Sequence, residues 1–180
     1  MRRIVIVGTM GAGKTTVGRA LAARLGWRYW DNDTELRRRT GSSAATLAAA
    51  HGVDELHRIE AEVLAAGLAL AEPAVVAAPG SVALHRPPPF PDPVVWLRAS
   101  PATLAARVGA GDGRPGLGSL AAVDAARRPG FAALATVTVD VDDRSVAEVV
   151  DAILARLDAS GPKLSHGSVT VAGCDSRPSS

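Results

Sequence analysis

The chain is short of cysteine and of long apolar runs, and each shortage excludes a class of protein. Among its 180 residues there is one cysteine, Cys174, so no internal disulfide can form. That count suits a reducing compartment, and we expect a cytoplasmic protein. Arg, Asp or Gly interrupts the apolar stretches well before the roughly 18 residues that a membrane-spanning helix needs. We therefore expect no membrane partner.

Aromatic residues and a strong charge of either sign are also scarce. Aromatic side chains make up 3% of the chain, and 20 basic residues against 18 acidic ones leave a formal net charge of +2. The basic cluster at 37–39 is typical of a solvated helix end, and no aromatic side chains alternate with it to stack on bases. We therefore expect no nucleic-acid partner.

The first thirty residues alternate between strand and helix patterns. Residues 3–7 form a short β-branched apolar run that Gly8 ends, which is typical of a strand buried on both faces of a parallel sheet. From Thr15 onward, apolar residues recur at spacings of four until Gly26, which predicts an amphipathic helix.

The same alternation continues to the end of the apolar sequence. Further strands are predicted at 27–30, 74–78, 94–97 and 136–139, and helices at 34–40, 43–50, 53–71, 101–108, 119–128 and 146–157. This pattern predicts a three-layer α/β fold with a five-stranded parallel sheet and helices on both faces. We expect one domain over 1–158. Because 159–180 is rich in Ser, Gly and Pro, we expect a disordered C-terminal tail there.

A phosphate-binding loop lies between the first strand and the first helix. The segment Gly8-Thr9-Met10-Gly11-Ala12-Gly13-Lys14-Thr15 satisfies the P-loop pattern G-x-x-x-x-G-K-[ST]. The glycines let backbone N–H groups point at phosphate oxygens, and the helix that follows directs its positive end at the same anion. Lys14 is expected to bind the β and γ oxygens, and Thr15 a Mg²⁺ ion. The predicted nucleotide-binding residues here are Gly11, Ala12, Gly13, Lys14, Thr15 and Thr16.

Two carboxylates, Asp31 and Asp33, follow the second predicted strand. They are expected at the carboxyl edge of the sheet, where ligands of open α/β sheets bind. Beside a triphosphate, one carboxylate suits the water shell of a metal and the other suits the acceptor hydroxyl. The alternative is a plain turn whose Asp caps a helix starting near Thr34.

A glycine-rich segment at 109–118 carries one arginine, Arg114. A short lid of this composition could close over the γ-phosphate, neutralise developing charge and exclude water. The alternative is a solvated linker.

These motifs, taken as an ordered set, resemble those of the shikimate kinase family, a group of P-loop small-molecule kinases. The resemblance covers residues 3 to about 157 and rests on the loop and helix start at 8–19, Asp31-x-Asp33, Arg58-Ile59-Glu60, Gly113-Arg114-Pro115 and Arg127-x-Pro129-x-Phe131. It implies a P-loop NTPase-type fold and a monomer. It also implies an ATP- and Mg²⁺-dependent kinase that phosphorylates a hydroxyl of a small carboxylated metabolite, with shikimate 3-phosphate as the first candidate product.

The resemblance also implies individual roles. Asp31 takes the metal side with Thr15, and Asp33 orients the acceptor hydroxyl and accepts its proton. Lys14, Asp33 and Arg114 are the implied catalytic residues. Arg107 packs on the adenine. The implied acceptor-binding residues are Asp33, His57, Arg58, Gly80 and Arg127. Arg127 would grip a carboxylate. Of the neighbours Arg127 and Arg128, one is expected to face solvent.

The sequence departs from the family pattern around the acceptor. His57 stands where the family has an arginine, and Arg58 follows it about 100° further round the helix. The family's run of three glycines is Ala78-Pro79-Gly80 here, and the segments 81–93 and 115–126 are short. The sequence thus predicts an intact nucleotide loop with a divergent acceptor pocket.

Three functions remain open at this point. The first is a divergent shikimate kinase. The second is a kinase for another small hydroxy compound or a nucleoside monophosphate. The third is a nucleotide-binding module without transferase activity.

Overall fold

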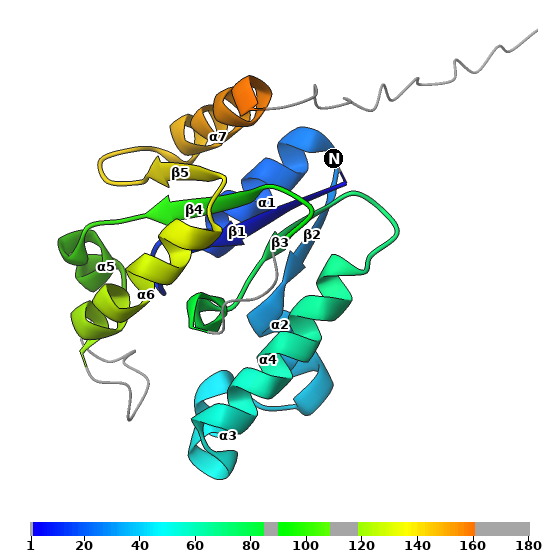
Figure 1. Cartoon of the computed structure of the whole chain (residues 1–180), viewed down its shortest axis with the longest axis vertical. Helices are drawn as coiled ribbons and strands as arrows, with labels where there is room; N and C mark the ends of the chain where they lie inside the picture. Colours follow the sequence, from blue (N-terminus) through cyan, green and yellow to red (C-terminus); the bar gives the residue numbers. More distant parts are fainter. Residues whose placement is uncertain (1, 85–89, 109–118, 161–180) are drawn as a thin grey trace, which may run out of the picture.

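The computed structural model describes residues 2–84, 90–108 and 119–160, and it contains a parallel sheet with helices on both faces (Figure 1). The strands are β1 (Arg3–Val7), β2 (Arg28–Asp31), β3 (Ala74–Ala77), β4 (Val94–Arg98) and β5 (Val137–Asp140). They lie in the order β2-β3-β1-β4-β5, and every neighbouring pair is parallel. The predicted three-layer fold is confirmed. Because β1 is central, the loop that follows it lies in the middle of the carboxyl edge of the sheet.

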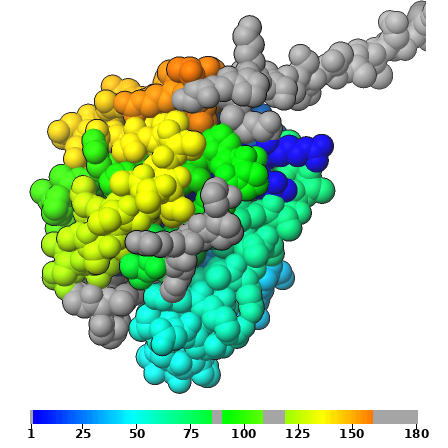
Figure 2. Space-filling view, in the orientation of Figure 1, coloured from blue at the N-terminus to red at the C-terminus, as the bar shows by residue number. Residues whose placement is uncertain are grey.

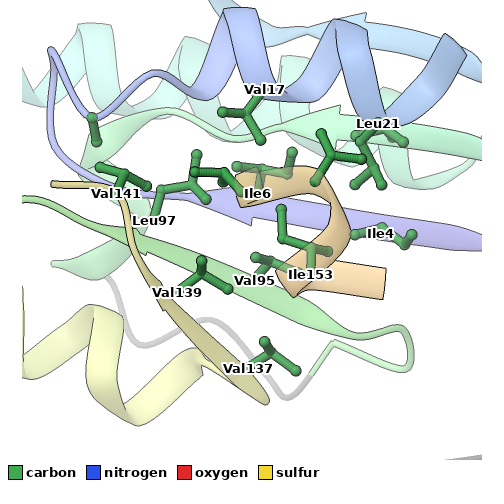
Figure 3. Close-up of a cluster of buried hydrophobic side chains, with 14 of the residues drawn as sticks. Ile4, Ile6, Val17, Leu21, Val95, Leu97, Val137, Val139, Val141 and Ile153 are labelled. Atoms are coloured by element: carbon green, nitrogen blue, oxygen red, sulfur yellow. The ribbon is translucent and has the colours of Figure 1, made fainter. Parts of the chain in front are cut away.

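Alternate side chains of β1 enter two separate cores, as the strand geometry requires. Ile4 and Ile6 pack on one face with α1 (Lys14–Leu25), α7 (Val146–Ser160) and Leu104 of α5 (Pro101–Val108). Figure 3 shows this cluster, with Ile153 of α7 and Leu21 of α1 directed at the strands. The burial on both faces explains why the strand reads as a continuous apolar run.

Val5 and Val7 enter the second core, on the opposite face. There they meet side chains of α2 (Asn32–Thr40), α3 (Ala44–His51), α4 (Val53–Leu68), the 3₁₀ helix η1 (Gly80–Ala83) and α6 (Leu120–Leu134). Phe131 of α6 is fully buried in this core, 6.0 Å from the Trp96 ring. In Figure 2 the cyan α3 and the adjoining part of α4 protrude at one end of the molecule.

Most predicted elements are present, but several boundaries were wrong. The structure places α2 at Asn32–Thr40 instead of 34–40, because the capping side chain is Asp31, whose Oδ1 accepts from the Thr34 N–H at 3.0 Å. Strands β2 and β5 begin one residue later than predicted, and α4 ends at Leu68 instead of 71. Helix α7 ends at Ser160 instead of 157, and residues 161–180 lie outside the described part of the chain.

The largest correction concerns α6, which was predicted to end at residue 128, before Pro129. The helix instead runs through Pro129 to Leu134. Proline removes the N–H that would bond to the carbonyl of Ala125. Both Ala125 and Pro129 are exposed, so water can satisfy that carbonyl. The buried Phe131, two residues further on, supplies packing that keeps the helix going.

Helix α5 begins with a side-chain cap. Ser100 Oγ accepts from the Thr103 N–H at 3.2 Å, and Pro101 occupies the first helical position. Within the ranges described, no helix has both the length and the apolarity to cross a bilayer.

Candidate active site

A pocket of about 350 Å³ opens at the carboxyl ends of β1, β2 and β3. Its walls come from the phosphate loop and the start of α1, from the ends of β2 and β3, and from α5 and α6. The lining residues are Thr9, Met10, Gly11, Gly13, Lys14, Thr15, Thr16, Asp31, Asn32, Asp33, Ala77, Ala78, Pro79, Gly80, Arg107, Leu120, Val123 and Arg127. Most of the predicted site residues therefore meet in one cavity.

The phosphate loop has the backbone that the motif predicts. Gly11 and Gly13 adopt positive φ values of 84° and 93°, and α1 begins directly after Gly13. The Lys14 ammonium lies across the loop and donates to the Gly8 carbonyl at 2.8 Å and to the Thr9 carbonyl at 3.4 Å. The loop thus directs one cation and a helix N-terminus at the same point, which is the arrangement that binds a polyphosphate.

Asp31 is the best-connected carboxylate of the pocket. Its Oδ2 accepts from the Tyr29 hydroxyl at 2.7 Å and from the Thr15 hydroxyl at 3.1 Å, while its Oδ1 caps α2. Burial alone would raise the pKa of Asp31, but the hydrogen bonds from Tyr29, the Thr34 amide and Thr15 outweigh it and lower that pKa. Burial, reinforced by the bond to Asp31, also raises the pKa of Tyr29, which therefore stays a donor. Asp31 is both the cap that the alternative interpretation required and a pocket carboxylate.

Asp33 is the second residue of α2 and follows Asn32 in the chain. Its side chain is exposed and lines the pocket. Asn32 is 1% exposed, so the two carboxylates flank a buried residue. Asp33 is therefore accessible to a ligand, whereas Asp31 is half-buried against Thr15.

Arg127 of α6 lines the same pocket. It is 7% exposed, and its guanidinium packs against Gly80, where an added Cβ would lie 2.6 Å from Nη1. Gly80 therefore leaves the space that the guanidinium occupies. Of the pair, Arg128 is the more exposed, with its side chain 33% exposed. It is not simply solvated, because its Nε donates to Asp124 Oδ2 and its Nη2 donates to the Ala99 carbonyl, both at 2.6 Å.

A second, smaller pocket of about 240 Å³ adjoins the first through Gly13 and Thr16. Ala12 lines this second pocket, together with two arginines, Arg107 and Arg144, and the apolar residues Val17, Val141, Val146 and Val149. Arg107 Nη1 donates to the Gly11 carbonyl and its Nη2 donates to the Val141 carbonyl, each at 3.4 Å. An apolar slot with a planar guanidinium on its edge suits a flat heterocycle.

Two predicted residues of the described chain, His57 and Arg58, line neither the first pocket nor the second one. Arg58 is exposed on α4, where it pairs with Glu55 and Glu62. His57 is half-buried on the same helix and is not among the pocket-lining residues of the described chain. Arg114 lies outside the described residues.

Sequence reasoning missed Asp124, Thr9 and Arg144. Asp124 is 5% exposed, and its Oδ1 accepts from the Thr9 hydroxyl at 2.5 Å. The spacing of four between Asp124 and Arg128 could have indicated a helical ion pair. The contact with Thr9, 115 residues away, has no signal in the sequence.

The residues present fit ATP with Mg²⁺. Magnesium in kinase sites usually takes one or two carboxylates together with phosphate oxygens and waters, so it needs no dense ligand cluster. The Thr15 hydroxyl and the ionised Asp31 lie 3.1 Å apart at the head of α1 and satisfy that requirement. Within the part of the chain that the structure covers, no group of three or more His, Cys, Asp or Glu side chains suits a metal by itself.

Known proteins match this chain over nearly its full length. A family model for shikimate kinase matches residues 10–158. Shikimate kinase of Symbiobacterium thermophilum is 39% identical over 175 residues, which cover 89% of this chain and 98% of that protein. Shikimate kinase of Thermobifida fusca is 38% identical over 165 residues, which cover 87% and 95%.

A solved structure agrees with these relatives. Shikimate kinase from Acinetobacter baumannii in complex with shikimate superposes with a TM-score of 0.81 at 26% identity, covering 91% of this chain and 96% of that one. Shikimate kinase from Aquifex aeolicus has the same fold at 23% identity and a TM-score of 0.73, covering 87% and 96%. The chain therefore belongs to the shikimate kinase family.

Proposed function

We propose that this chain is an ATP-dependent kinase that transfers the γ-phosphate to a hydroxyl of shikimate, giving shikimate 3-phosphate and ADP. The observation that carries the proposal is the single pocket in which the phosphate loop, Asp33 and Arg127 lie together. Membership of the shikimate kinase family, and the likeness to a shikimate kinase solved with shikimate, support the choice of acceptor.

The donor side is the loop at 8–15 with the start of α1. Its N–H groups bind phosphate oxygens, and the Lys14 ammonium moves from the loop carbonyls to the β and γ oxygens. Thr15 and Asp31 would hold Mg²⁺ at the head of α1. The metal supplies neutralisation of charge on the β- and γ-phosphates.

The acceptor side is built from Asp33, Arg127 and Gly80. The guanidinium of Arg127 matches a planar carboxylate with two parallel N–H donors. Asp33 accepts a hydrogen bond from the reacting hydroxyl and takes its proton as the new P–O bond forms. The bond between the γ-phosphorus and the β–γ bridging oxygen breaks, and ADP leaves with that oxygen. In this proposal His57 and Arg58 contribute less to the acceptor than the sequence suggested, since neither lines the pocket.

The nucleoside side uses the second pocket. Arg107 lies along the adenine, and Arg144, which also lines this pocket, contributes a second cation. Arg114 is proposed to close over the γ-phosphate from the segment at 109–118. A monomer and a cytoplasmic location stay predictions from the resemblance and the composition.

A panel of acceptors tests the proposal. Purified protein with Mg-ATP is given shikimate, gluconate or a nucleoside monophosphate, and ADP release is measured against the Lys14→Ala variant as baseline. We expect ADP release above baseline with shikimate alone. Turnover of another member of the panel would transfer the assignment to a different hydroxy compound. ATP binding without turnover of any acceptor would leave a nucleotide-binding module.

A further inference from the structure

A buried carboxylate links the phosphate loop to the helix that carries the acceptor arginine. Asp124 Oδ1 accepts from the Thr9 hydroxyl at 2.5 Å, and Asp124 Oδ2 accepts from Arg128 Nε at 2.6 Å. Arg128 in turn donates from Nη2 to the carbonyl of Ala99, just beyond β4, at 2.6 Å. Thr9 and Asp124 are only 2% and 5% exposed. One carboxylate thus joins the loop, α6 and the end of the central sheet.

The burial of this charge needs a reason. A buried carboxylate is costly to desolvate, and a buried ion pair often stabilises a fold no more than apolar residues of the same size would. Such groups can instead specify one arrangement of the elements that they join. Here the joined elements are the phosphate loop and α6, which both line the proposed active site.

The position of Asp124 on α6 gives the link a consequence. Asp124 precedes Arg127 by three residues, so the two side chains project from neighbouring positions on the helix surface, one turn apart. Holding Asp124 against Thr9 therefore fixes how far α6 is rotated and advanced at Arg127. Arg127 has little room to move with the helix, because its guanidinium packs directly against the backbone of Gly80.

The other end of the link, Thr9, belongs to the loop that would bind the nucleotide. The Thr9 carbonyl accepts from Lys14 Nζ at 3.4 Å and from the Ala12 N–H at 3.1 Å. When the Lys14 ammonium leaves the loop carbonyls for a phosphate, the bonds that hold Thr9 change. The Thr9 side chain passes that change to Asp124 and so to α6.

We propose that Asp124 is a positioning residue which, through the Thr9 hydroxyl, ties the phosphate loop to α6 and sets Arg127 for the anionic group of the acceptor. The identity of the acceptor rests on the proposed function, whereas the link between the phosphate loop and α6 does not. The proposal gives Asp124 no contact with substrate. It acts only through Thr9, Arg128 and the helix.

The first test measures kinetics in three single variants, in a double variant and in a control. Thr9→Val removes the hydroxyl with little change of shape, Asp124→Asn removes the charge, and Asp124→Ala removes both bonds. Thr9→Val and Asp124→Ala should each raise KM for shikimate about tenfold, with KM for Mg-ATP changed less than about twofold. The double variant should be no worse than Asp124→Ala alone, since both changes break one link. Asp151→Ala, which removes an exposed ion pair with Arg24, is the matched control and should leave both constants unchanged.

The second test needs no acceptor. Amide hydrogen exchange over α6 is followed in the wild-type chain and in Thr9→Val, with and without Mg-ADP. Nucleotide should slow exchange at 124–131 in the wild-type chain and not in the variant. If that difference is seen while shikimate is not turned over, the proposed function fails and the link stands. If Thr9→Val keeps the wild-type KM for shikimate and the same nucleotide-dependent protection, showing only a lower melting temperature, the inference is overturned.

Discussion

At the scale of single residues, the charged side chains of the pocket differ in their surroundings. Lys14 and Arg127 line the pocket from α1 and α6, while Asp31 lines it from the end of β2 and Asp33 from the start of α2. Asp31 is half-buried and bonded to Thr15 and Tyr29, whereas Asp33 is exposed to the cavity. This separation supports a division of labour in which one carboxylate serves the metal and the other the acceptor.

Replacing Lys14 tests the donor side. Lys14→Ala removes the ammonium that would neutralise the transferred phosphate, so kcat should fall by about 10²-fold or more. ADP release in a coupled assay measures it. The matched control is Lys163→Ala, which changes the other lysine of the chain. Near-normal turnover in Lys14→Ala would contradict the assigned role.

Replacing Asp33 separates binding from chemistry. Asp33→Asn keeps the size of the side chain but cannot take a proton, so kcat should drop by about 10²- to 10⁴-fold while Mg-ATP still binds. Calorimetric titration and ADP release together measure the two effects. Asp54→Asn is the control, since Asp54 is an exposed first-turn aspartate of α4 outside the pocket. Phosphoryl transfer that survives Asp33→Asn would remove Asp33 from the mechanism.

The lowered pKa of Asp31 predicts how stability depends on pH. A carboxylate whose pKa is lower in the folded chain than in the unfolded chain stabilises the fold above its unfolded value, which is 3.8, and loses that contribution as the pH falls through the folded value. Asp31→Asn keeps a capping side chain but loses the charge. The variant should therefore be less stable than the wild-type chain near neutral pH, with the difference shrinking below about pH 4. Urea unfolding at several pH values measures it, and a difference that stays constant with pH would count against the ionised carboxylate.

At the scale of elements, the part of the pocket formed by Arg127 and Gly80 depends on the contact between α6 and η1. Gly130 of α6 lies so close to η1 that an added Cβ would fall 1.9 Å from the Ala83 carbonyl oxygen. That approach lets Arg127, three residues earlier, reach Gly80. Pro129 lies on the exposed side of the helix, so its missing N–H does not disturb the contact.

Adding one methyl group at this contact should therefore move the helix. Gly130→Ala should cost about 1–3 kcal/mol of unfolding free energy and raise KM for shikimate, because α6 can relieve the overlap only by shifting Arg127. Ala126→Ser, an exposed change on the same helix, should stay within about 0.5 kcal/mol. Urea unfolding and acceptor kinetics on both variants measure this. A fully stable Gly130→Ala variant would show that α6 does not need the close approach.

At the scale of the whole molecule, the sequence predicted the features that depend on residues close together in the chain. The strand at 3–7 is buried on both faces and so reads as one apolar run, and the phosphate loop is contiguous. The order of strands and helices followed from these local patterns. The carboxyl edge of a parallel sheet then predicted that Asp31 and Asp33 would join the loop.

Features that depend on tertiary packing were missed or misplaced. The path of α6 through Pro129 depends on the core around Phe131, and the bond between Thr9 and Asp124 joins residues 115 apart. Arg58 was a candidate ligand because it follows His57, where the family has an arginine, but it is exposed on α4 and pairs with Glu55 and Glu62. Which of two adjacent helical residues faces a pocket is decided by the packing of the helix.

The central claim is that this pocket transfers the γ-phosphate of ATP to a carbon-bound hydroxyl of shikimate. Phosphorus NMR of the wild-type chain incubated with Mg-ATP and shikimate tests it most directly. A phosphate monoester signal coupled to the proton on C3 of shikimate should grow in step with ADP and be absent with Lys14→Ala. Formation of ADP with inorganic phosphate as the only other product, or no ADP at all, would contradict the claim.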